Sequence, residues 1–67
     1  MAYFIKSTVG NDKEQISPYN MNKYDAIKDA LETAKSLVNY ASFEISVWNY
    51  NEYSSNDLIL EIKGTGE

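Results

Sequence analysis

A single stretch of this chain carries the spacing of an amphipathic helix, and it runs from about Asn22 to Tyr40. Within it, apolar side chains recur at steps of three and four residues, which predicts one apolar stripe. Asn22 can cap the first turn, and Asp25 places a negative charge near the positive end of the helix dipole. At about 1.5 Å per residue the helix is about 27 Å long, enough to lie across a small sheet. The predicted stripe consists of Tyr24, Ile27, Leu31, Ala34, Leu37 and Val38.

Two segments after the helix predict a β-hairpin. In Ser42–Tyr50 and again in Asp57–Lys63, apolar residues occupy every second position, which is the period of a strand with one buried face. The residues between them, Asn51–Asn56, are rich in asparagine and serine, which favour turns. The two strands are therefore expected to pair in antiparallel fashion.

The segment before the helix is less regular. Ala2–Val9 alternates as a strand does, and Gly10–Lys13 is a turn signal. Glu14–Ser17 can return as a short second strand before Pro18. The pattern favours the order ββαββ, with βαββ as the alternative. Either order gives an α+β fold in which one helix packs on one face of a small antiparallel sheet, and residues 1–67 are expected to form one small domain.

The alternation also predicts which side chains face the helix. The expected core takes the apolar stripe of the helix together with one face of each strand. Because one helix covers only one side of a sheet, a domain of this size buries little apolar surface, and it has no disulfide to compensate. The predicted core residues are Tyr3, Ile5, Val9, Tyr24, Ile27, Leu31, Ala34, Leu37, Val38, Phe43, Ile45, Val47, Leu58, Leu60 and Ile62.

The opposite face of the sheet is then expected to hold four large side chains that nothing in the chain covers, namely Phe4, Trp48, Tyr50 and Ile59. An exposed aromatic patch bordered by charges is typical of an association surface, and Trp and Tyr often dominate binding energy. A second interpretation is that this face is simply wet, with aromatic side chains that pair across strands for local stability.

Missing residue types narrow the chemistry. The chain has no cysteine and no histidine, so it offers neither a thiolate nucleophile nor the usual zinc ligands. All six basic residues are lysine, so the bidentate fork with which arginine grips phosphate or guanine is absent. Glu52, Asn56 and Asp57 supply oxygens in one loop, but their spacing does not match a calcium loop, and a polar turn explains them better. We therefore expect no metal, no cofactor and no catalytic residue.

The charge balance points to the kind of partner. A net charge of -4 opposes binding to nucleic-acid backbones and to anionic membranes, and it suits a basic or nucleic-acid-binding protein. The first residues do not resemble a signal peptide, and no apolar run could cross a bilayer. A cytoplasmic protein is the expectation. Plain solubility also accounts for a modest negative charge.

Three sharper hypotheses use the same residues. A carboxylate pair such as Glu44 and Glu61 could serve acid–base catalysis, but a sheet backed by one helix predicts no cleft to shift a pKa. Sheet aromatics such as Phe4 and Trp48 could stack bases of a single strand, although few cations accompany them. Carboxylates could also imitate phosphates and so block a nucleic-acid-binding enzyme.

In size, charge and lack of arginine, the chain resembles the small acidic proteins of bacteriophages and mobile elements of low-GC bacteria. That resemblance implies an inhibitor or modulator that occludes a host protein. We therefore expect a non-enzymatic protein-binding module that acts on a protein partner, on itself as a homodimer, or on both. The expected anchors are Phe4, Trp48, Tyr50 and Ile59, with Tyr53 at the rim and Glu44, Glu52, Asp57 and Glu61 as steering charges.

Overall fold

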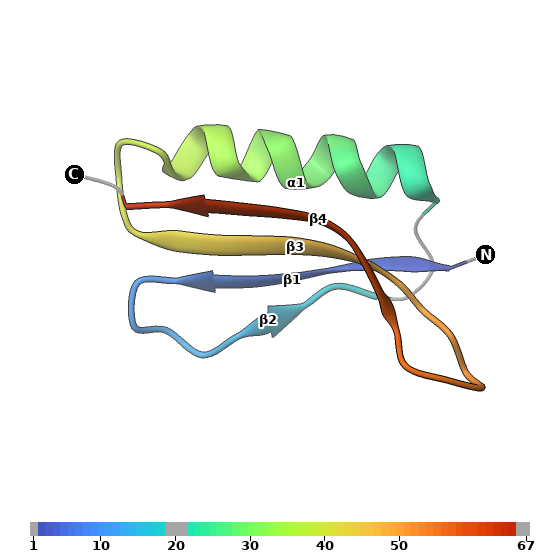
Figure 1. Ribbon diagram of the computed structural model, residues 1–67. Coiled ribbons are helices and arrows are strands. Elements are labelled where there is room, and N and C mark those ends of the chain that lie inside the picture. Colours follow the sequence, from blue (N-terminus) through green and yellow to red (C-terminus); the bar gives the residue numbers. More distant parts are fainter. Residues whose placement is uncertain (1, 19–21, 66–67) are drawn as a thin grey trace.

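The computed structural model describes residues 2–18 and 22–65, and in these ranges one helix packs on a four-stranded antiparallel sheet (Figure 1). The strand order is β2-β1-β3-β4, so β2 and β4 are the two edges. The predicted α+β class and the favoured ββαββ order are both confirmed. The elements are β1 (Tyr3–Val9), β2 (Gln15–Ile16), α1 (Lys23–Leu37), β3 (Phe43–Asn49) and β4 (Asp57–Gly64).

The start of α1 follows the sequence prediction. Asn22 is the cap, and its Oδ1 accepts a hydrogen bond from the Asp25 backbone N–H at 2.8 Å. The Asn22 amide also donates to the Asp25 carboxylate at 2.7 Å. The helix ends earlier than predicted, at Leu37, whose carbonyl accepts from the backbone N–H groups of Tyr40 and Ala41.

The face that α1 turns to the sheet differs from the predicted stripe. Its buried residues are Ala26, Ala30 and Ala34, which recur every four residues. Small side chains let the helix backbone lie close to the sheet, so the alanines form the contact and the larger residues are displaced to one side. The prediction that Tyr24, Leu31 and Val38 belong to the core is wrong, since these side chains are 75%, 51% and 49% exposed.

The first edge strand of the sheet, β2, is short, and a turn precedes it and a proline follows it. Gly10 turns the chain with a positive φ of 58°, a conformation that glycine adopts without strain. After the two residues of β2, Ser17 continues the contact with β1, because its backbone N–H donates to the Ile5 carbonyl and its hydroxyl accepts from the Ile5 N–H. Pro18 follows and lacks a backbone donor.

The second edge, β4, is long and contains a β-bulge. Val47 of β3 pairs with Leu60, whereas the next residue, Trp48, pairs with Leu58, so Ile59 is the extra residue. A bulge resets the in-and-out alternation and bends the strand, and Figure 1 shows β4 curving away from α1 in its first half. The prediction of Leu58 as a core residue is wrong for this reason: it lies opposite Trp48 and is 49% exposed.

The core lies between α1 and the face of the sheet that carries Ile5, Phe43, Ile45 and Val47. Tyr3, Ile27, Leu37, Leu60 and Ile62 pack against it while partly exposed. The molecule is elongated, with extents of 39 × 21 × 16 Å, because α1 runs along the strands. Gly64 lies against the Phe43 ring, where an added Cβ would overlap the ring carbons.

Candidate functional site

The face of the sheet turned away from α1, called here the reverse face, carries a compact aromatic cluster. Phe4 and Trp48 pair across β1 and β3. The Trp48 indole N–H donates to the Ser46 hydroxyl at 2.8 Å, and the Lys6 ammonium lies 4.8 Å from the Trp48 ring centroid. This is the geometry of a cation–π contact. The indole therefore has both its polar group and one ring face occupied within the chain.

Phe4 was expected to be exposed on the reverse face, and this prediction is wrong. Its side chain is 0% exposed, the same degree of burial as Val47 in the main core. The Lys6 ammonium lies 6.0 Å from its ring centroid and Trp48 is its cross-strand neighbour. A side chain with no accessible surface cannot touch a partner directly, so Phe4 supports the fold of this face.

Two of the predicted steering carboxylates meet at one lysine. Lys63 Nζ lies 3.4 Å from Glu44 Oε1 and 3.8 Å from Glu61 Oε1. Glu44 and Lys63 are also direct neighbours across β3 and β4. All three side chains are at least half exposed, so the pairs contribute little to stability. They do offset each other's charge, and this part of the reverse face is less acidic than the sequence suggested.

The remaining predicted site residues lie near the other end of β3. Tyr50 follows β3 and donates its backbone N–H to the Ala2 carbonyl. Glu52 and Tyr53 are exposed in the loop between β3 and β4, and Asp57 begins β4 opposite Asn49. Since Glu44 stands five residues before Asn49, about 16 Å along the strand, the structure does not bring all the steering carboxylates together.

The loop itself is held by its own asparagines. The Asn51 backbone N–H donates to Asn56 Oδ1 at 2.9 Å, and Asn51 Oδ1 accepts from the Tyr53 N–H at 3.0 Å. These bonds confirm the predicted turn chemistry. In both bonds the side-chain oxygen of an asparagine accepts from a backbone N–H within the loop.

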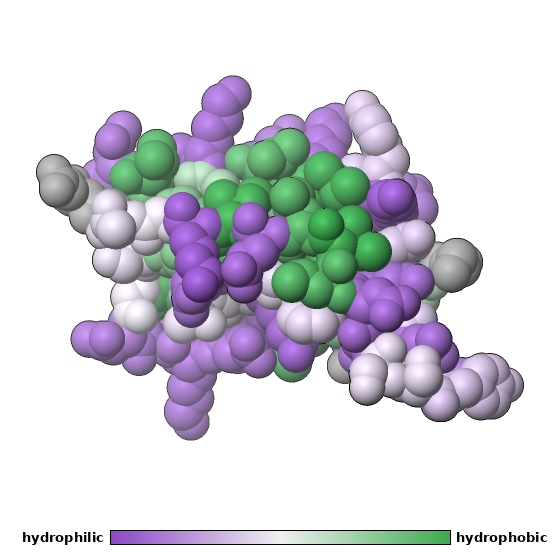
Figure 2. Space-filling view, in the orientation of Figure 1, coloured by the Kyte–Doolittle hydropathy of each residue, from purple (hydrophilic) through white to green (hydrophobic). Residues whose placement is uncertain are grey.

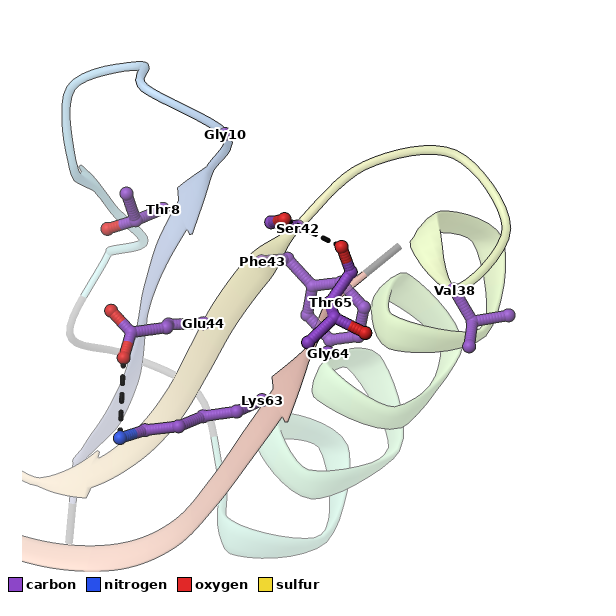
Figure 3. Close-up of a pocket in the computed structure, with 9 residues that line it drawn as sticks. All are labelled: Thr8, Gly10, Val38, Ser42, Phe43, Glu44, Lys63, Gly64 and Thr65. Carbon is purple, nitrogen blue, oxygen red and sulfur yellow. Dashed lines mark hydrogen bonds and ion pairs between the residues drawn. The ribbon is translucent and has the colours of Figure 1, made fainter. Parts of the chain in front are cut away.

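A hollow of about 660 Å³ lies at the end of the molecule where β4 stops (Figure 3). Glu44 and Lys63 line it from the reverse side, and Phe43 and Val38 line it on the α1 side. The Ser42 hydroxyl donates to the Thr65 carbonyl at 2.7 Å. An activated serine donates instead to a base, so this arrangement offers no primed nucleophile.

Three exposed apolar side chains follow one side of α1. Tyr24, Leu31 and Val38 follow one another at seven-residue steps, and seven residues return a helix to nearly the same angular position. We call these three residues the α1 flank.

The position of the flank follows from helix geometry. Leu31 lies about 100° around the helix from Ala30 in one direction, and Asp29 lies about 100° in the other. Asp29 and Thr33 line a hollow with Ile16 and Ser17 and so face the β2 side of the molecule. The α1 flank therefore faces the opposite side, toward β4.

The apolar surface continues from the α1 flank onto β4. Figure 2 shows hydrophobic surface along α1 that extends onto the adjoining strand, with hydrophilic side chains interrupting it nearer the C-terminal end of β4. On β4 itself, Leu60 and Ile62 lie on the α1 side and are partly exposed, whereas the exposed Leu58 lies opposite Trp48 on the reverse face. Ile59, the extra residue of the bulge, is exposed as well.

Sequence reasoning missed the α1 flank because it assigned these residues to the core. One signal could have found them. Ala26, Ala30 and Ala34 form a stripe of small residues at four-residue steps, and such a stripe permits the closest approach of a helix to a sheet. The large residues about 100° away are then left at the border of the contact.

Within the described ranges, the structure holds no group of three or more acidic side chains close enough to ligate a metal. No helix there combines the length and the apolar character needed to cross a bilayer. Comparisons with protein-family models, with curated proteins and with solved structures returned no match.

Proposed function

We propose that this protein is a non-enzymatic binding module that acts by covering part of a protein surface. The observation that carries the proposal is the apolar surface formed by the α1 flank and β4, which leaves Tyr24 and Leu31 more than half exposed. Exposed apolar patches rimmed by charges are typical of protein–protein contacts. A small acidic module of this kind fits an inhibitor or modulator that occludes its target, as in the phage proteins that the composition resembles.

The α1 flank supports binding better than the reverse face does. On the reverse face, Phe4 is buried and the Trp48 indole is engaged by Ser46 and Lys6. A partner would have to displace the lysine to reach that ring face. On the α1 flank, burial of Leu31 removes apolar area from water, at about 25 cal/mol per Å².

The arrangement of aromatics weakens the case for nucleic-acid binding. Base stacking needs open aromatic faces beside a cationic groove. Here Phe4 has no accessible face, and Lys6 already covers one face of Trp48. Imitation of phosphates needs free carboxylates, yet Glu44 and Glu61 both contact Lys63.

Affinity capture with matched variants tests the proposal. The immobilised protein is exposed to a lysate of a low-GC bacterium, and captured proteins are compared among wild type, Leu31→Lys, Trp48→Ala and the control Glu32→Lys. Glu32 is exposed on the same helix, about 100° farther around than Leu31. We expect a protein that binds wild type, Trp48→Ala and Glu32→Lys but not Leu31→Lys.

Two outcomes oppose this proposal in different ways. Capture that is lost with Trp48→Ala and kept with Leu31→Lys would move the binding surface to the reverse face. Failure of wild type to bind either a lysate protein or itself would reject the binding module altogether.

A further inference from the structure

The two edge strands of the sheet, β2 and β4, differ in length and in how they are protected from pairing with another strand. The β2 edge has two paired residues followed by Pro18, whereas β4 is eight residues long and contains no proline. Natural sheets shield their edges with short strands, prolines, charges or bulges, because an open edge pairs with another strand. On β4 the bulge lies at Ile59, so the segment from Leu60 to Gly64 is a regular edge.

A two-fold axis can pair this segment with the same segment of a second copy in antiparallel fashion. Side chains that lie directly opposite each other must project from the same face of the joined sheet. Within the segment, that condition allows the axis to pass beside Leu60, Glu61, Ile62 or Lys63 but not between residues. Each choice sets different charges opposite each other across the contact between the two β4 strands, called here the seam.

Charge separates the four choices. An axis at Glu61 or at Lys63 sets that charged residue opposite itself, which is repulsive. An axis at Leu60 sets Glu61 opposite the bulged Ile59 of the other copy. An axis at Ile62 sets Glu61 opposite Lys63 twice by symmetry. Since Lys63 already neighbours Glu44 across β3 and β4, the axis at Ile62 extends a row of alternating charges from one copy into the next.

The same axis brings the α1 flanks together. Val38 and Gly64 line one hollow, so they lie near each other at the end of the molecule. Leu31 stands seven residues before Val38, which is about 10.5 Å along the helix. The same distance spans about three residues of a strand, so Leu31 lies level with Glu61, three residues before Gly64. A two-fold axis at Ile62 sends Gly64 to the level of Leu60. Leu31 of one copy and Val38 of the other are then level, on the same side of the joined sheet.

We propose that the occupant of this surface is a second copy of the chain, joined β4 to β4 around Ile62 into one continuous eight-stranded sheet. This inference rests on the proposed function and specifies its partner. The Glu61–Lys63 pairs select the register, and Leu31 and Val38 supply the apolar part of the seam.

Charge reversal tests the register. Glu61→Lys alone sets like charges across the seam twice, and so does Lys63→Glu alone. Sedimentation velocity is used to measure dimerisation of each variant, with Glu32→Lys and Lys13→Glu as controls that make the same changes of net charge away from β4. We expect each seam variant to raise the dimer dissociation constant at least about tenfold and the controls to leave it within about twofold.

The decisive experiment mixes Glu61→Lys with Lys63→Glu and measures how much heterodimer forms. In a mixed pair, the lysine introduced by Glu61→Lys in one chain would face the glutamate introduced by Lys63→Glu in the other. At the second contact, the original Lys63 of the first chain would face the original Glu61 of the second. Native mass spectrometry with one variant isotopically labelled therefore should show the heterodimer in excess over both homodimers. The proposal is overturned if Glu61→Lys and Lys63→Glu each dimerise as strongly as wild type, or if the mixture shows no excess of heterodimer.

The result also separates this inference from the proposed function. A monomeric wild type that still captures a lysate protein through Leu31 overturns the dimer and leaves the binding module standing. A monomeric wild type that captures nothing overturns both. A dimer weakened by the seam variants and restored by mixing supports both.

Discussion

Phe4 and Trp48 are neighbours on one sheet face, yet the structure gives them different roles. Phe4 is fully buried and acts as a second, smaller core on the reverse face. Phe4→Leu removes part of a buried ring, and we expect it to lower the free energy of unfolding by about 1–2 kcal/mol. Urea denaturation followed by circular dichroism measures this loss. Tyr53→Leu removes another aromatic ring, this one in the exposed loop, and should stay within about 0.5 kcal/mol. Equal effects of the two substitutions would contradict the burial of Phe4.

The Asn22 cap is a second residue with a definable contribution. Its Oδ1 accepts from the Asp25 N–H, one of the donors that the first helical turn leaves without an intrahelical partner. Asn22→Ala should lower the free energy of unfolding by about 1 kcal/mol, whereas Asn22→Asp or Asn22→Ser should restore most of it. Thermal denaturation provides the measurement, and Asn39→Ala, past the end of α1, is the control. A loss of stability that serine and aspartate fail to repair would mean that Asn22 acts in some other way.

At the scale of elements, the alanine stripe determines how α1 lies on the sheet. Ala30 has no accessible surface, and a larger side chain there must push the helix away from β3 and β1. Ala30→Leu should lower the free energy of unfolding by about 1–3 kcal/mol despite the greater hydrophobicity of leucine. Glu32→Leu introduces the same residue on the exposed side of the same helix and should be nearly neutral. A stabilised Ala30→Leu protein would show that the helix and sheet leave unfilled space between them.

The strands and the helix could be predicted because their signals are local. The alternation of Phe43, Ile45 and Val47 with polar residues sets a strand and its buried face within seven residues. The Asn22 cap and the turn at Gly10 likewise depend on residues close in sequence. Even β2, only two residues long, could be anticipated, because Pro18 and the turn signal bracket it.

The helix face and the bulge could not be predicted in the same way, because each depends on contact between distant elements. Both an alanine stripe and a stripe of larger residues satisfy the helical period, and only the closeness of the sheet selects the alanines. The shift at Ile59 is defined relative to β3, so nothing in β4 alone reveals it. The alanine contact leaves Leu31 exposed at the border of α1 and β4, where the candidate surface lies. The bulge places the exposed Leu58 opposite Trp48 on the reverse face.

For the whole molecule, the stability of a 67-residue chain depends on how much apolar surface it can bury. One helix covers one face, the reverse face supplies the small cluster around Phe4, and the α1 flank stays open. Pairing through β4 would bury part of that flank and satisfy the backbone groups of the open edge. Association and folding are therefore expected to be coupled in this protein.

Coupling of this kind makes unfolding depend on protein concentration. For a dimer that unfolds to separate chains, each tenfold rise in concentration adds about 1.4 kcal/mol per dimer to the apparent stability. We expect the urea midpoint of wild type to rise between about 1 and 100 µM protein, a span worth about 2.7 kcal/mol. The midpoints of Leu31→Lys and Glu61→Lys should rise less than that of wild type over the same range, because their dimers are weaker. Glu32→Lys should follow wild type, because its charge lies away from the seam. Midpoints of wild type that coincide at all concentrations would show that the chain folds alone and that β4 remains an unpaired edge.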